Sequence, residues 1–156
     1  MSPESFALHL ARGKAASLAA AHPESWILAA DQIGVLGGEL LHKPGTEEAA
    51  VAQLMRLAGR SHRLISGVVL TCPSTGEFHE LSDHQRLRMR AFTEDEARAY
   101  VREHRPLDCV GSYRIEDAGI KLFAAIESVD FTGIIGLPLI AVSALLRKVG
   151  LLPGGD

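Results

Sequence analysis

An acid and a lysine flank a predicted turn near residue 40, and together they could handle a phosphorylated substrate. Asp31 follows an apolar run at residues 26 to 30, and Lys43 precedes Pro44-Gly45, beyond a Gly37-Gly38 turn. A hairpin would fold Lys43 back toward Asp31, placing a carboxylate able to hold Mg²⁺ or activate water beside a cation able to hold phosphate. The alternative is structural, because aspartates often bond the backbone of turns and lysines are usually solvated.

Lys14 is a third charged residue whose place needs an explanation. It falls between Leu10 and Leu18 in an apolar stripe of a predicted helix, which Ser2 and Pro3 begin as an N-cap and a favoured first residue. A lysine in such a stripe must either extend along the surface to solvent or meet an anion. Both interpretations stay open at this point.

Adjacent acids at Glu116 and Asp117 lie in a segment flanked by Gly111 and Gly119. A carboxylate there could accept hydrogen bonds from the N–H groups of a purine base, and two adjacent carboxylates could share a metal ion. An ordinary solvated loop would have the same composition.

Hydrophobic periodicity predicts the elements that must position these side chains. We expect helices over residues 3 to 22, 46 to 58, 93 to 104 and 138 to 149. We expect strands at residues 26 to 30, 32 to 36, 39 to 41, 62 to 71, 77 to 90 and 119 to 126, and a short extended piece at 131 to 135. The predicted fold class is α/β, with a mixed sheet flanked by helices.

Composition narrows the class of partner. The chain has 156 residues, 47% of them hydrophobic, and a formal net charge of −3. It therefore has no global basic field for a nucleic-acid polymer, and no apolar stretch is long enough to span a membrane. Cys72 and Cys109 lie far apart, in no metal-ligand or redox spacing, which favours a reducing cytoplasm.

Five segments stand in a recognisable order along the chain: GKAASLA, ILAADQIGVLGGELLHKPG, LAGRSHRLISGVVL, YVREHRPLDCVGSYRIEDAGIKLFAAI and IIGLPLIAVSALLRKVG. This order resembles the Maf family of nucleoside triphosphate pyrophosphatases, over nearly the whole sequence. The resemblance implies the α/β fold shared with inosine-triphosphate pyrophosphatases, in which a mixed sheet surrounds a cleft. It also implies cleavage of a nucleoside triphosphate to the monophosphate and pyrophosphate, with a divalent cation, Mg²⁺ or Mn²⁺, as cofactor.

The resemblance implies a role for each candidate residue. Asp31 is the general base and a metal ligand, and Lys14 and Lys43 hold the phosphates. Gln32 and Glu116 are specificity residues, and the combination of Asp31-Gln32 with Glu116 resembles the branch that acts on 7-methyl-GTP rather than on dTTP and UTP. A methylated guanine is cationic, so a carboxylate at Glu116 can pair with its charge while accepting its N–H bonds.

Two departures accompany the resemblance. Asp117 stands where the family usually has glycine, which could crowd the base pocket or alter selectivity. Members also usually open with a strand and a Ser- and Arg-rich loop that grips the triphosphate, so we expect one Maf-like domain at residues 1 to 156 lacking that segment. The two candidate functions are hydrolysis of a nucleotide such as 7-methyl-GTP and nucleotide binding without hydrolysis, and a homodimer is the candidate assembly.

Overall fold

The computed structural model describes residues 1 to 154, and the last two residues of the predicted domain lie outside the described residues. The chain divides by its internal contacts into two compact units. The first unit contains residues 1 to 32, 65 to 83 and 130 onward, and the second contains residues 33 to 64 and 84 to 129. Lys14, Asp31 and Gln32 belong to the first unit, whereas Lys43 and Glu116 belong to the second.

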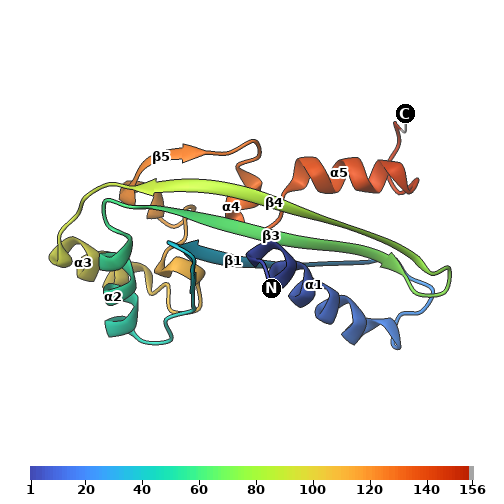
Figure 1. Cartoon of the computed structure of the whole chain (residues 1–156), viewed down its shortest axis with the longest axis horizontal. Coiled ribbons are helices and arrows are strands. Elements are labelled where there is room, and N and C mark those ends of the chain that lie inside the picture. The colour runs from blue at the N-terminus through green and yellow to red at the C-terminus, as the bar shows by residue number, and fades with distance from the viewer. Residues whose placement is uncertain (155–156) are drawn as a thin grey trace. The chain divides into compact units, whose positions relative to one another are not determined.

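Five strands form a sheet in the order β2-β1-β3-β4-β5, which confirms the predicted α/β class with a sheet flanked by helices (Figure 1). The strands are β1 (Ile27–Leu36), β2 (Glu39–Leu41), β3 (Ser61–Cys72), β4 (Glu77–Met89) and β5 (Phe123–Glu127). β1 and β2 make the predicted antiparallel hairpin, pairing Gly34 with Leu41 and Leu36 with Glu39. The turn uses Gly37 and Gly38, whose φ angles of 58° and 92° favour glycine.

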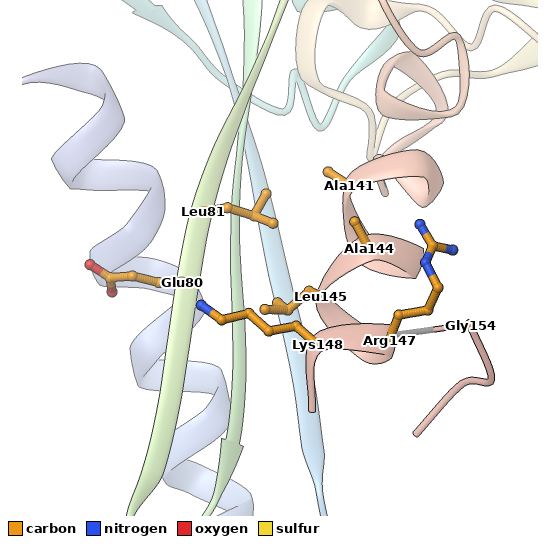
Figure 2. Close-up of a pocket in the computed structure, with 8 residues that line it drawn as sticks. All are labelled: Glu80, Leu81, Ala141, Ala144, Leu145, Arg147, Lys148 and Gly154. Atoms are coloured by element: carbon orange, nitrogen blue, oxygen red, sulfur yellow. The ribbon is translucent and has the colours of Figure 1, made fainter. Parts of the chain in front are cut away.

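The helices of the first unit are α1 (Pro3–Ala19), α4 (Thr132–Ile135) and α5 (Leu139–Lys148). Figure 2 shows α1 and α5 on opposite sides of β4. Ser2 caps α1 as predicted, its side chain accepting a hydrogen bond from the backbone N–H of Ser5 at 3.2 Å. At 17 residues α1 is the longest helix among residues 1 to 154, and none of the helices there is long and apolar enough to cross a membrane.

The buried face of α1 differs from the predicted one. Three alanines face the sheet, with exposed fractions of 0% for Ala7, 0% for Ala11 and 3% for Ala15, whereas Leu18 is 46% exposed. The reason is a close approach of α1 to β3, since a Cβ added at Gly67 would lie 2.5 Å from the carbonyl carbon of Ala7. Only small side chains fit between backbones at that separation.

The second unit is built on α2 (Glu47–Leu57) and α3 (Glu94–His104). Thr46 caps α2, and Thr93 forms the predicted capping box with Glu96 at the start of α3. The core of this unit consists of apolar and aromatic residues from both helices and the strands, among them Leu36, Leu54, Leu57, Met89, Val101, Tyr113 and Leu122.

Two predicted extended segments are wrong in part. The strand predicted at residues 119 to 126 starts at Phe123, because residues 119 to 122 form a 3₁₀ turn that closes the preceding loop. The piece predicted at 131 to 135 is the short helix α4. Asp130 explains the second error, because its carboxylate accepts hydrogen bonds from the backbone N–H of Thr132 at 2.9 Å and of Ile140 at 2.8 Å. These bonds favour helical turns after residue 130.

Candidate active site

Lys14 and Asp31 form an ion pair in the first unit. The Lys14 ammonium contacts the Asp31 carboxylate and donates a second hydrogen bond to the backbone carbonyl of Ala30 at 3.0 Å. The side chains of Lys14 and Asp31 are 57% and 20% exposed. The lysine therefore meets an anion while remaining open to solvent, so both interpretations of its position hold.

The alternation of side chains along β1 brings this pair together. Ile27 and Ala29 pack against Ala11 and Ala15 of α1, and Asp31, two residues further, lies on the same face of the strand. The sequence placed Asp31 at the end of a strand, and this is wrong because β1 continues unbroken to Leu36. Asp31 stands within the strand, where the neighbouring helix supplies its partner.

Gln32 points to the other face of β1. Its Nε2 donates to the backbone carbonyl of Gly133 at 2.7 Å and lies 3.2 Å from the hydroxyl of Ser66. These bonds connect β1 with β3 and with α4, all within the first unit. Gln32 thus has a structural contact that the sequence did not predict.

Lys43 follows β2 in the second unit and is exposed. Among the described residues, neither Lys43 nor Glu116 makes a hydrogen bond or an ion pair, so both are available to a ligand. The proximity of Lys43 to Asp31 that the sequence suggested stays a prediction.

Gln53 holds the chain next to Lys43, and sequence reasoning missed it. Its Nε2 donates to the carbonyl of His42 at 2.9 Å and to the hydroxyl of Ser112 at 2.7 Å, while its Oε1 accepts from the His42 N–H at 3.3 Å. The lysine segment and the start of the acidic loop are therefore tied to one helix residue. The only signal in the sequence is a polar residue bordering the apolar face of α2.

The loop that carries Glu116 has a buried anchor at its start. Tyr113 is 5% exposed and its hydroxyl lies 2.7 Å from Nε2 of His62, which is 2% exposed. Burial lowers the pKa of His62 to about 4 and raises that of Tyr113, so both groups are neutral at pH 7. Nδ1 of His62 has no hydrogen-bond partner among residues 1 to 154.

The carboxylates fit a metal ion only in part. Within the described residues, no group of three or more His, Cys, Asp or Glu side chains could hold a metal. Asp31 supplies a single carboxylate, and Mg²⁺ is commonly bound by one or two carboxylates together with substrate phosphates. The residues present therefore fit a cation that arrives with a nucleotide, and not one held by the protein alone.

A groove of about 790 Å³ lies elsewhere in the first unit, between β4 and α5 (Figure 2). Leu81, Ala144 and Leu145 line it, and Lys148 reaches toward β4 at its rim. Neither Lys14 nor Asp31 contributes to this groove. Its lining offers one ammonium, one guanidinium and the carboxylate of Glu80, which already accepts hydrogen bonds from Arg12 at 2.8 and 2.7 Å.

Comparison with known proteins identifies the family. A family model described as "Maf-like protein" matches residues 1 to 149. A protein of Xanthomonas axonopodis pv. citri named 7-methyl-GTP pyrophosphatase is 42% identical over 149 residues, which cover 96% of this chain and 77% of that protein. Proteins of the same name from Aromatoleum aromaticum and Syntrophotalea carbinolica are each 39% identical, covering 96% and 100% of this chain and 77% and 80% of their own lengths. The chain therefore belongs to the Maf family.

Proposed function

We propose that this chain hydrolyses 7-methyl-GTP to the nucleoside monophosphate and pyrophosphate. The relatives named above carry that activity in their names. The observation that carries the proposal is the contact of the Lys14 ammonium with the Asp31 carboxylate, which puts a base and a phosphate-binding cation at one place on β1.

Asp31 acts as the general base. Water attacks the α-phosphorus, its proton passes to a carboxylate oxygen of Asp31, and the bond from the α-phosphorus to the bridging oxygen of the β-phosphate breaks. Pyrophosphate leaves with that oxygen and its electron pair. Lys14 and Lys43 bind the phosphate oxygens, on which negative charge increases in the transition state.

A divalent cation, Mg²⁺ or Mn²⁺, is the cofactor that we propose, with Asp31 as its protein ligand. When bound, it would neutralise phosphate charge and polarise the phosphoryl group. In the structure the Asp31 carboxylate contacts the Lys14 ammonium, so a bound cation would share this carboxylate with Lys14.

Glu116 is the residue that we propose for recognition of the base. Its carboxylate is exposed and has no ion-pair partner within residues 1 to 154. It can accept the N1–H and N2–H bonds of guanine while pairing with the positive charge of the methylated ring. Gln32 contributes indirectly, because its amide is bonded to Ser66 and Gly133 and fixes the strand beside Asp31.

The partner in this proposal is a nucleoside triphosphate and not a nucleic-acid polymer, which suits a chain of net charge −3. Cys72 and Cys109 are free thiols, consistent with the reducing cytoplasm as the compartment that we propose. A homodimer stays a prediction.

Hydrolysis is tested by measuring phosphate released after coupled pyrophosphatase treatment, with Mg²⁺ present. We expect 7-methyl-GTP to be turned over faster than GTP, dTTP and UTP. The Asp31→Asn variant should lose about 10²- to 10⁴-fold in turnover, as is typical when a general base is removed. Wild-type turnover no higher than that of Asp31→Asn would contradict the proposal, and tight calorimetric binding without product would favour a binding module.

A further inference from the structure

The loop that carries Glu116 is a closed turn. The carbonyl of Arg114 accepts hydrogen bonds from the N–H groups of Asp117 at 3.1 Å and Gly119 at 2.9 Å. A Cβ added at Gly119 would lie 2.2 Å from that carbonyl oxygen. The turn therefore closes tightly, and Glu116 sits within it.

α3 fastens this turn through Tyr100. The Tyr100 hydroxyl accepts a hydrogen bond from the N–H of Arg114 at 3.1 Å, and it lies within donating distance of the carbonyls of Arg114, at 3.2 Å, and Asp117, at 3.1 Å. Tyr100 is 7% exposed. Burial raises its pKa, so the hydroxyl keeps its proton for these bonds.

A second fastening joins Asp117 to the end of α3. Nδ1 of His104 donates to Oδ1 of Asp117 at 3.0 Å, and the side chains are 14% and 43% exposed. The guanidinium of Arg114 lies 3.6 Å from the other oxygen of Asp117 and donates to the carbonyl of His104 at 3.4 Å. Asp117, the residue that departs from the family pattern, is thus bound at both carboxylate oxygens.

Glu116 is held from both sides by these contacts. Its preceding neighbour, Ile115, is 5% exposed, and its following neighbour is the fastened Asp117. An exposed carboxylate on a free loop would sample many positions, and ordering it on binding would reduce affinity. Here the protein orders the flanking residues before any ligand binds.

We propose that Asp117 and His104 are positioning residues that hold the Glu116 carboxylate for a cationic purine. The inference rests on the proposed function, because it assigns Glu116 to the base. Asp117 does not touch the base in this scheme, since its oxygens are occupied by His104 and Arg114. Glu116 can attract the positive charge of a methylated ring in addition to accepting the hydrogen bonds that neutral guanine also offers, so a loosened loop loses more binding free energy for 7-methyl-GTP than for GTP.

The test compares Asp117→Ala with Glu103→Ala. Glu103 precedes His104 on α3 and approaches its other ring nitrogen at 3.6 Å, so the control removes a carboxylate from the same histidine without touching the loop. We expect Asp117→Ala to lower the ratio of kcat/KM for 7-methyl-GTP to kcat/KM for GTP about fivefold, mainly through a higher KM for 7-methyl-GTP. This magnitude is typical of the loss of one charged hydrogen bond that affects the substrate only through a neighbouring residue. Asp117→Asn, which keeps an acceptor for His104, should restore most of the ratio.

Hydrogen exchange of the backbone amides measures how firmly the loop is held, and it does not depend on enzyme activity. We expect the amides of Asp117 and Gly119 to exchange faster in Asp117→Ala than in the wild type or Glu103→Ala. The amides of the double variant Asp117→Ala with His104→Gln should exchange no faster than those of Asp117→Ala alone, because both changes break the same hydrogen bond, between His104 and Asp117.

Equal exchange in Asp117→Ala and Glu103→Ala would overturn the inference, as would faster exchange with an unchanged substrate ratio. Absence of wild-type turnover on every nucleotide would instead refute the proposed function. In that case the ratio of the dissociation constants for GTP and 7-methyl-GTP, measured by calorimetry, replaces the kinetic ratio. An equal ratio in Asp117→Ala and in the wild type would then overturn the inference.

Discussion

The close approach of α1 to β3 gives the sharpest prediction about stability. In Gly67→Ala, the new Cβ would lie 2.5 Å from the carbonyl carbon of Ala7 and 2.6 Å from the N of Leu8. Carbon atoms in ordinary contact stand about 3.5 Å apart or more, so α1 must move by about 1 Å. Both obstacles are backbone atoms, and no side-chain rotation can relieve the overlap.

The loss of stability in Gly67→Ala follows from the contacts of α1 that this movement weakens. Ala7, Ala11 and Ala15 are all but fully buried on the sheet, and a gap of about 1 Å forfeits roughly a quarter to a half of their contact energy. With each methyl contributing about 0.8 kcal/mol, this is roughly 1 kcal/mol, and strain from overpacking adds about 1 kcal/mol or more. A loss of about 2 kcal/mol should lower the melting temperature by about 4 to 8 °C in a chain of this size.

Gly13→Ala is the matched control on the same helix. A Cβ at Gly13 meets no heavy atom within 4 Å, so alanine should raise the stability of α1 by up to about 1 kcal/mol. Thermal unfolding of both variants should therefore move in opposite directions. A melting temperature of Gly67→Ala at or above that of the wild type would refute the close packing, and with it the explanation of the alanine face.

Two further predictions concern ionisable groups. Lys14→Met should reduce turnover about 10²-fold, as for loss of one charge-stabilising donor, while the melting temperature changes little because the Lys14 side chain is 57% exposed; unchanged kcat would contradict a catalytic role. For His62, the folded pKa of about 4 lies below the ordinary 6.5, so the folded state binds fewer protons in that window and loses about 3 kcal/mol as pH falls from 6.5 to 4. In urea unfolding, the free energy of unfolding of His62→Gln should fall by about 3 kcal/mol less than that of the wild type over this pH range. His9→Gln, at an exposed position, should follow the wild type. The same pH dependence in both variants would contradict the low pKa of His62.

Local signals predicted the helix starts well, because each depends on residues close in sequence. Ser2, Thr46 and Thr93 all cap the helices expected of them. The strands expected at residues 62 to 71 and 77 to 90 match β3 and β4, which the turn from Pro73 to Gly76 joins. The errors at residues 119 and 131 have the opposite origin, since Arg114 and Asp130 accept bonds that periodicity does not register.

The candidate site was predictable by residue type but not by geometry. Lys14 and Asp31 were singled out, yet their contact spans 17 positions and depends on which face of β1 meets α1. The fastening of Asp117 by His104 also had no signal, because a lone histidine at the end of a helix is commonly a surface residue. Such contacts follow from packing between elements, which the order of residues does not reveal directly.

Small residues link stability and site geometry in the first unit. Leucines facing the sheet from α1 would bury more apolar area than alanines, and on area alone they would stabilise the helix more. They would also hold α1 further from β1, and the flexible Lys14 side chain would then have to extend further to reach the Ala30 carbonyl and the Asp31 carboxylate. The close packing of Ala7 and Ala11 on the sheet at Gly67 therefore also shortens the reach that the ion pair demands of Lys14, so a substitution that loosens this packing should weaken the ion pair even where no charged residue is changed.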